Sequence, residues 1–292
     1  MYSSDYQRLM GIIDISEDDT LYYHYCSSDT FLSICNGKKL RFSDMHSMND
    51  FLEGEWGYKI FKQVCHALVS ENKVSLDFMK EVDLILHDAS IHHLKLICCL
   101  STNEDVLSQW RAYSNDGNGY CLGFSAKELL KMPITILKVL YNKLEQYENI
   151  ETILQTLYKI YQENKEHENF IKLCYQLSVS LSRFKNPAFK EEAEIRLIHI
   201  AQLDLSEEDN PKYIFDNGYS NKEPVNYKIN YRMNGSIPTA FIDFDFFINE
   251  VNPIKKVFLG PKNIANPNGV FITMNTLGLK GSEIKKSKAS YR

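Results

Sequence analysis

The sequence predicts an α+β fold with a mixed or antiparallel sheet as its core and helical insertions around it. Strand-like segments occur from residue 21 to about residue 260, and segments with helical spacing of apolar residues lie between them. No linker, internal repeat or low-complexity tract divides the chain. We therefore expect one α+β domain over residues 1–292, with residues 142–182 as a helical insertion within it.

The first elements follow from aromatic alternation and helix-end signals. Residues 21–26 alternate aromatic and polar side chains, which is typical of a strand. Ser27-Ser28-Asp29 can cap a helix over residues 30–35, and Asn36-Gly37 is a helix-stop signal. Residues 40–43 then predict a second short strand.

The next part of the chain changes from a polar loop to helices and back to strands. Residues 45–54 are polar and predict a loop, whereas apolar residues between 56 and 94 recur at helical spacing. Residues 94–101 form a short apolar run bounded by polar residues, which favours a buried strand. A short helix at 106–113 and a glycine-rich turn lead to a strand at 120–124.

The second half of the chain begins with a strand candidate at 134–141. Residues 142–182 predict two amphipathic helices broken near 164–168, and residues 194–200 alternate like a half-buried strand. Residues 203–226 are polar and contain Pro and Gly, so we expect a loop. The remaining signals are strands at 227–232, 239–247 and 255–260 and a helix at 270–281.

Composition limits the classes of function. The 292 residues are 44% hydrophobic and 24% charged, with a net charge of -5, which gives no general attraction to nucleic acid. Seven cysteines without CxxC spacing predict buried thiols rather than disulfides or a zinc site. With neither a signal peptide nor a long apolar run, we expect a cytoplasmic protein without a membrane segment. Phosphate-loop, zinc-protease and nucleophile-elbow motifs are absent from the sequence.

The most informative polar cluster is Glu191-Glu192-Ala193-Glu194-Ile195-Arg196 at the start of a predicted strand. In a strand, Glu192, Glu194 and Arg196 share one face, while Ile195, Leu197 and His199 share the other. Paired carboxylates beside a guanidinium can hold a sugar or act in acid–base chemistry. Equally, they can be charged residues at a solvated strand end.

Four further residues are candidates for ligand contact. His24 lies in the aromatic strand, where it is either a core histidine or the first polar group of a site. Trp110 and Tyr113 lie three residues apart on one side of a helix, which favours core packing or stacking on a ligand. Arg111 faces elsewhere and can donate to a phosphate.

Many of the segments described above, taken in their order along the chain, resemble the pattern of a widespread bacterial family known only as a domain of unknown function. Two positions depart from its pattern: Phe51 stands where the family usually has proline, and Cys26 where it has threonine. The resemblance covers nearly the whole chain. It rests on His24-Tyr25, Leu40 to Ser43, Asn49-Asp50 with Glu53, Trp110 with Tyr113, Gly119 to Phe124, Lys138 to Tyr141, Phe189 to Arg196, Val257 to Pro261, Ser287 and Tyr291-Arg292.

A looser similarity links the chain to the ADP-ribosyltransferase superfamily. That superfamily also has an opening histidine followed by a helix and glycine, an aromatic residue in the middle and Glu-x-Glu on a late strand. The resemblance implies NAD as substrate and a transferase or glycohydrolase activity of a toxin or antiphage defence effector. It also implies an unidentified protein or nucleic-acid acceptor and, in a defence system, a partner protein.

The same resemblance implies roles for individual residues. Glu194 holds the nicotinamide ribose and stabilises an oxocarbenium-like state, and Glu192 orients the acceptor. His24 binds the adenosine ribose, so His24 and Glu194 are expected to face one cleft across adjacent strands. The remaining expected contacts are Tyr113 or Trp110 stacked on nicotinamide, with Tyr120 as a competing choice, and Arg41 or Arg196 at the pyrophosphate, with Arg111 as a further donor.

Two other classes of function remain open. Asp243 and Asp245 share a strand face and, with Glu283, are compatible with a metal-dependent nuclease. In a non-catalytic sensor or partner-binding module, the motifs are structural and Glu194 with Arg196 is an internal ion pair.

Overall fold

The computed structural model describes residues 20–47, 53–163, 167–204, 211–214, 218–220 and 223–291. The Asn49-Asp50 pair and Phe51 lie outside the described residues, as do residues 164–166 of the helix break expected near 164–168. All structural statements below refer to the described ranges.

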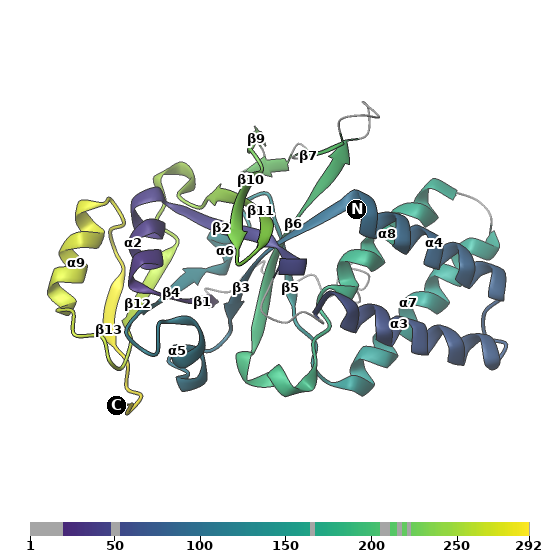
Figure 1. Cartoon of the computed structure of the whole chain (residues 1–292), viewed down its shortest axis with the longest axis horizontal. Coiled ribbons are helices and arrows are strands. Elements are labelled where there is room, and N and C mark those ends of the chain that lie inside the picture. The colour runs from purple at the N-terminus through teal and green to yellow at the C-terminus, as the bar shows by residue number, and fades with distance from the viewer. Residues whose placement is uncertain are drawn as a thin grey trace.

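Strands and helices both occur along the whole described chain, with the paired helices α3–α4 and α7–α8 and a run of strands from β6 to β11 (Figure 1). The strands are β1 Leu21–Cys26, β2 Lys39–Asp44, β3 His93–Ser101, β4 Tyr120–Ser125, β5 Thr135–Lys138, β6 Glu194–Asp204, β7 Lys212–Ile214, β8 Gly218–Ser220, β9 Glu223–Val225, β10 Asn230–Asn234, β11 Ile237–Asp245, β12 Ile254–Leu259 and β13 Glu283–Lys286. The helices are α2 Ser28–Gly37, η1 Met45–Ser47, α3 Glu53–Ser70, α4 Leu76–His92, α5 Leu107–Tyr113, α6 Ala126–Leu129, α7 Lys143–Glu163, α8 His167–Leu181, η2 Pro187–Glu192, η3 Ile248–Glu250 and α9 Pro267–Thr276.

Most of the strands join one mixed sheet, in the order β10-β11-β2-β3-β1-β4-β12-β13, with β6 on the other edge of β3. The neighbours are antiparallel except for β12 and β13, which are parallel. The predicted α+β class with a mixed sheet is thus confirmed.

The sheet is split along one edge of β3. There, β2 pairs with Leu96 and Ile97, whereas β1 pairs only at Ser101. The opposite edge of β3 is paired with β6 from His93 to Ser101. Among the described strands, β1 and β2 therefore diverge from a common neighbour and leave the edge of β3 open between their two contacts.

The two faces of the sheet carry different layers. One face holds the main hydrophobic core beneath α2, α6 and α9, with Phe31, Ala126 and Val270 among its residues. On the other face, α5 covers β1 and β4 through Trp110, and α8 lies over the small cluster on β3, β5 and β6. These coverings leave a space on the second face between α5 and α8, beside the split.

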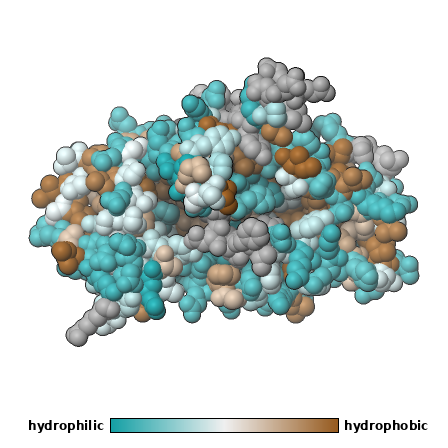
Figure 2. All heavy atoms as spheres, viewed as in Figure 1, coloured by the Kyte–Doolittle hydropathy of each residue, from teal (hydrophilic) through white to brown (hydrophobic). Residues whose placement is uncertain are grey.

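Helices α3, α4, α7 and α8 form a separate helical group with its own hydrophobic core (Figure 1). Apolar residues at helical spacing, such as Val64 and Leu68 on α3 and Leu154 and Leu157 on α7, meet in this core. Helices α7 and α8, which lie within residues 142–182, thus pack against the helices that precede β3. On the face in Figure 2, exposed hydrophobic residues are scattered among hydrophilic ones.

Several boundaries differ from the sequence predictions. The expected loop at 45–54 includes η1 and the first residues of α3, and the loop expected at 203–226 contains β7, β8 and β9. Helix α2 runs through Gly37, and Lys38 is the left-handed residue that ends it. Strand β13 and helix α6 lack a clear pattern because each spans only four residues. None of the described helices has the length and apolar character needed to cross a bilayer.

Candidate functional site

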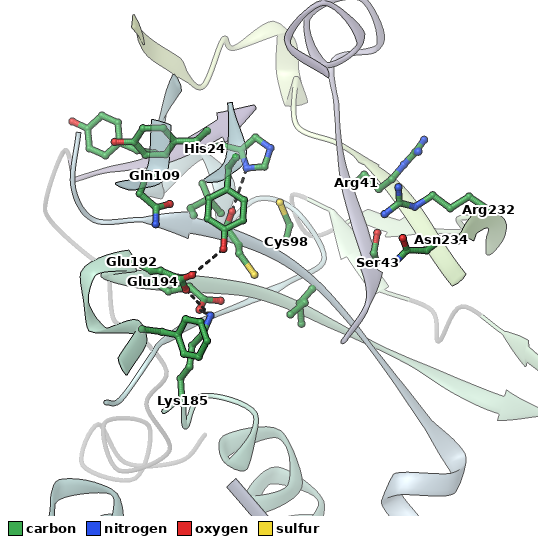
Figure 3. Close-up of a pocket in the computed structure, with 17 residues that line it drawn as sticks. His24, Arg41, Ser43, Cys98, Gln109, Lys185, Glu192, Glu194, Arg232 and Asn234 are labelled. Carbon is green, nitrogen blue, oxygen red and sulfur yellow. Dashed lines mark hydrogen bonds and ion pairs between the residues drawn. The ribbon is translucent and has the colours of Figure 1, made fainter. Parts of the chain in front are cut away.

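A cavity of about 570 Å³ lies at the split in the sheet (Figure 3). Strands β1, β2, β3 and β10 contribute to its wall, together with α5 and the segment that leads into β6. The residues that line it are Tyr23, His24, Tyr25, Arg41, Ser43, Ile97, Cys98, Cys99, Leu100, Gln109, Tyr113, Lys185, Phe189, Glu192, Glu194, Arg232 and Asn234. Four of them, His24, Tyr113, Glu192 and Glu194, are the residues that the sequence predicts as catalytic.

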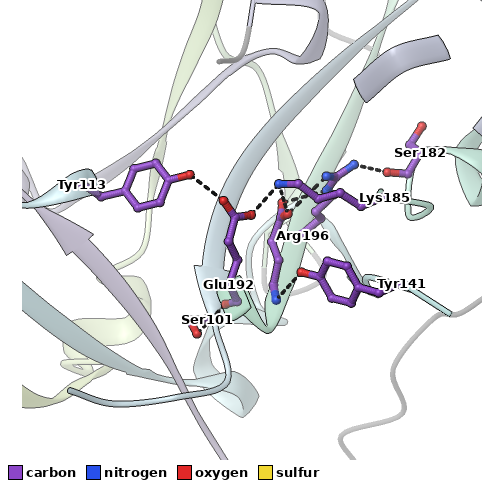
Figure 4. Close-up of polar contacts among 8 residues, drawn as sticks. Ser101, Tyr113, Tyr141, Ser182, Lys185, Glu192 and Arg196 are labelled. Atoms are coloured by element: carbon purple, nitrogen blue, oxygen red, sulfur yellow. Dashed lines mark hydrogen bonds and ion pairs between the residues drawn. The ribbon is translucent and has the colours of Figure 1, made fainter. Parts of the chain in front are cut away.

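The two carboxylates reach the same lysine through an unusual backbone conformation. Glu192 ends the 3-10 helix η2, and Ala193 then adopts a left-handed conformation with φ of 45° before β6 begins at Glu194. Strand alternation therefore does not extend to Glu192, contrary to the sequence expectation. Even so, Lys185 Nζ contacts Glu192 Oε2 at 2.5 Å and Glu194 Oε2 at 2.8 Å (Figure 4).

Glu192 is held from two sides. The Tyr113 hydroxyl, from α5, donates to Glu192 Oε1 at 2.8 Å, and Lys185 occupies the other oxygen. The backbone carbonyl of Glu192 accepts a hydrogen bond from Ser101 Oγ at 2.8 Å. Burial, followed by the charge of Glu192, raises the pKa of Tyr113, so this hydroxyl keeps its proton near neutral pH.

Glu194 is buried, with 4% of its side chain exposed, and is fixed by two cations. Arg196 Nε donates to Glu194 Oε1 at 2.8 Å, and Arg196 Nη2 donates to Oε2 at 3.2 Å. Arg196 also donates to the Ser182 carbonyl, and the Glu194 N–H donates to the Tyr141 hydroxyl at 3.0 Å (Figure 4). This geometry contains the internal ion pair expected for a non-catalytic module.

The cations decide the ionisation of Glu194. Burial raises the pKa of its carboxyl, but the charges and hydrogen bonds of Arg196 and the charge of Lys185 outweigh burial and lower the pKa to about 2. Glu194 is therefore a carboxylate at every physiological pH. It can stabilise positive charge or accept hydrogen bonds, but it cannot serve as a general acid.

His24 occupies the split itself. Alternation along β1 places it on the same side as Tyr22 and Cys26, opposite to Tyr23 and Tyr25, which face α5. Its ring lies in the gap, and Nδ1 is 3.2 Å from the Cys99 carbonyl (Figure 3). Burial lowers the pKa of His24 despite this hydrogen bond, so the ring is neutral at pH 7. Because a carbonyl only accepts, Nδ1 carries the proton and Nε2 is left as an acceptor.

His24 and Glu194 line one cavity, but their strands are not adjacent as predicted. Strand β3 lies between β1 and β6, so the two backbones are about two strand spacings apart, roughly 10 Å. Because side chains alternate along each strand, the Cα–Cβ bonds of His24 and Glu194 also point to opposite faces of the sheet. The split, which leaves the edge of β3 open, brings both side chains to the same space.

The other residues predicted to contact a cofactor divide into one that lines the cavity and four that do not. Arg41 is in the lining. Trp110 is fully buried between α5 and the strands β1 and β4, where its indole N–H donates to Asp105 at 2.8 Å, and Tyr120 stacks on Phe31 in the main core. Arg111 lies over the Tyr291 ring, and Arg196 is buried behind Glu194.

The three acidic residues considered for a metal site do not come together in the fold. Asp243 and Asp245 share a face of β11, but each pairs with a cation on β2, at 2.8 Å to Arg41 and 3.5 Å to Lys39. Glu283 is on β13, at the opposite end of the sheet, and pairs with Lys285. Within the described ranges, no group of three His, Cys, Asp or Glu residues is placed to hold a metal ion.

Several lining residues escape sequence analysis. Lys185 lies in a stretch that predicts only a turn, and Gln109 faces the cavity from a short helix. Arg232 and Asn234 are two residues apart on β10, as Arg41 and Ser43 are on β2. This shared spacing of polar residues is a signal for one polar face, but it does not show that the two strands border the same cavity.

Comparison with known proteins identifies a protein family over part of the chain. No curated protein and no solved structure matches the chain. The family match covers the middle of the chain, from α5 to β6, whereas the resemblance was expected over nearly all of it. It includes Tyr113, Lys185 and both carboxylates of the cavity. Over residues 109–197 the chain thus matches the family described as "Protein of unknown function (DUF2971)".

Proposed function

We propose that this protein is an NAD-consuming enzyme of the ADP-ribosyltransferase type. The observation that carries the proposal is a single cavity at a split in the sheet, lined by His24, Tyr113, Glu192 and Glu194. In the proposed reaction, the bond between nicotinamide and C1′ of its ribose breaks, and nicotinamide leaves with the electron pair. An oxygen or nitrogen of a protein, a nucleic acid or water then bonds to C1′ and releases its proton.

Glu194 has the electrostatic character that this reaction requires. The bond breaks through an oxocarbenium-like state, which a fixed carboxylate stabilises without reorganising. Arg196 and Lys185 hold the Glu194 carboxylate in one orientation and keep it ionised. They also offset its charge, so the proposal assigns Glu194 a hydrogen bond from the ribose hydroxyl as well as charge stabilisation.

The remaining polar groups suit the other parts of NAD. The neutral His24 ring offers Nε2 as an acceptor for a ribose hydroxyl. Glu192 is less buried than Glu194 and has lone pairs free beside its contacts with Tyr113 and Lys185, so it can accept a hydrogen bond from the incoming acceptor. The Tyr113 ring, 39% exposed, presents a face on which nicotinamide can stack.

A second candidate function is a module that binds a ligand in the same cavity without catalysis, and one observation favours it. Both oxygens of Glu194 are already bonded to cations, as expected of an internal ion pair. In that case the cluster of Glu194, Arg196 and Lys185 holds β6 against the segment before it, and the cavity binds a ligand without changing it.

The decisive experiment measures nicotinamide release and transfer of label from adenylate-labelled NAD in cell extract. Wild type is compared with Glu194→Gln, which keeps the side-chain shape but removes the charge, and with Tyr113→Phe, which removes only the hydroxyl that contacts Glu192. Glu191→Gln is the matched control, because Glu191 is an exposed neighbour outside the cavity lining. Circular dichroism and thermal unfolding show whether each variant folds.

The proposal predicts that wild type and Glu191→Gln release nicotinamide at the same rate. Glu194→Gln is expected to lose about 100-fold or more, the usual effect of removing one transition-state contact. Tyr113→Phe folds normally and loses less. If folded wild type releases no nicotinamide in any extract while the cavity still binds NAD, the binding module is the correct reading.

A further inference from the structure

Three strands place a row of polar side chains on one face beside the split. The register pairs Arg41 on β2 with Asp243 on β11, and Thr239 on β11 with Arg232 on β10. Because paired residues of antiparallel strands point to the same side, Arg41 and Arg232 share a face. The opposite face of these strands is in the main core, where Phe42 packs on Phe244.

Arg41 is held rigidly at this end of the cavity. Its Nε and Nη2 each donate to one oxygen of Asp243 at 2.8 Å, and its guanidinium lies 3.9 Å from the centre of the Phe241 ring. An arginine has five N–H donors, so three remain beyond the two used by Asp243. Arg41 can therefore donate to a ligand without giving up its ion pair.

Arg232 supplies a positive charge that no neighbouring carboxylate neutralises. Arg41 is neutralised by Asp243, and at the other end of the cavity Lys185 and Arg196 offset Glu192 and Glu194. The Arg232 side chain is exposed, lines the cavity and makes no ion pair or hydrogen bond with another described residue. Among the lysines and arginines that line the cavity, Arg232 is the one without a counter-charge in the described ranges.

We propose that Arg41 and Arg232 form a diphosphate clamp, with Ser43 and Asn234 as neutral neighbours in the lining (Figure 3). Two guanidinium forks from the strands on either side of β11 suit the planar oxygen pairs of a phosphate, and the net positive charge favours an anion. The occupant is a nucleoside diphosphate. This inference rests on the proposed function, because it takes the carboxylate end as the place of the nicotinamide ribose.

The clamp also assigns a direction to the ligand. Arg41 and Arg232 lie on one side of the view in Figure 3, and Glu192, Glu194 and Lys185 lie on the other, with His24 between them. A dinucleotide bound in this way has its diphosphate at the β2 and β10 strands and its reacting ribose at the start of β6. The β10–β11 hairpin thereby becomes part of the binding site.

The test measures binding of ADP-ribose, which has the diphosphate but no nicotinamide to release, by calorimetry at two salt concentrations. Adenosine, which has no phosphate, is the comparison ligand. The variants are Arg232→Gln, Arg232→Lys and, as a matched control, Arg111→Gln, since Arg111 lies outside the lining. We expect Arg232→Gln to weaken ADP-ribose binding about tenfold, Arg232→Lys to weaken it less, and added salt to weaken the wild type more than Arg232→Gln.

The outcomes separate the clamp from the proposed reaction. Equal ADP-ribose affinity in wild type and Arg232→Gln overturns the clamp, as does adenosine binding that is as tight as ADP-ribose binding. Loss of affinity in Arg232→Gln but not in Arg111→Gln supports it. If that loss is found while wild type releases no nicotinamide from NAD, the clamp stands and the proposed reaction fails.

Discussion

The ion cluster around Glu194 predicts a specific pH dependence of stability. The pKa of Glu194 is lowered from 4.5 to about 2, because Arg196 and Lys185 outweigh the opposing effect of burial. The unfolded chain therefore binds a proton near pH 4.5 that the folded chain does not bind until about pH 2. The stabilisation that the Glu194 carboxylate contributes is therefore fully present above about pH 4.5 and is lost as the pH falls from about 4.5 to about 2. The pKa difference corresponds to roughly 3 kcal/mol.

The perturbation is Glu194→Gln, and the assay is urea unfolding from pH 7 to pH 2.5. The wild type is expected to lose about 3 kcal/mol more than the variant over this range. Because glutamine leaves the buried Arg196 without its carboxylate, and leaves Lys185 with Glu192 alone, the variant is also less stable at pH 7, by roughly 3 to 5 kcal/mol. The double variant Glu194→Gln with Arg196→Met restores part of that loss, since the buried Arg196 charge is then no longer left beside a neutral amide, and Lys185 still has Glu192 as its partner.

Glu191→Gln is the control for this measurement, because its carboxylate is exposed. It should follow the wild-type curve. Identical pH dependence in wild type and Glu194→Gln would refute the reasoning, since it would mean that Glu194 titrates alike in the folded and unfolded chains.

Two further predictions concern positions outside the cavity. Asp105→Ala removes the acceptor of the Trp110 indole, the Ser287 hydroxyl and the Lys288 N–H, so thermal unfolding should show a loss of about 1 to 3 kcal/mol, and an unchanged midpoint would contradict it. Burial lowers the pKa of Lys95 to about 8, so the unfolded chain holds a proton between pH 8 and pH 10.5 that the folded chain has released. Wild-type stability from this group should therefore rise over that range, whereas Lys95→Met should lack the rise in urea unfolding.

The sequence predicted cavity residues best where the pattern that identifies them lies within a single segment of the chain. The aromatic alternation around His24 and the Glu-x-Glu at the start of β6 identified residues that line the cavity, because each lies within a single predicted element. The contact of Glu192 with Lys185 could not be predicted, since it depends on the left-handed conformation of Ala193, a residue with no special preference for it.

Features that depend on pairing between strands far apart in the chain could not be predicted from the sequence. The split in the sheet arises because β3 pairs with β2 and β1 at separate places, and neither pairing has a local signature. Arg232 joins the cavity only through the register of β10 on β11 and of β11 on β2. Trp110 and Tyr120 are aromatic residues of the expected type, but packing places them in the cores behind the wall.

The attachment of α5 has a consequence for the order in which the molecule folds and opens. Asp105, just before this helix, holds Ser287 and Lys288, and Asp116, just after it, holds Tyr291. Ser287 is 182 residues from Asp105, so this contact closes a very long loop and must offset its entropy. Contacts of this range form late, after nearby elements have assembled. The cavity wall that carries Tyr113 should therefore be among the last parts to close in folding, and among the first to exchange its amide hydrogens in the native state.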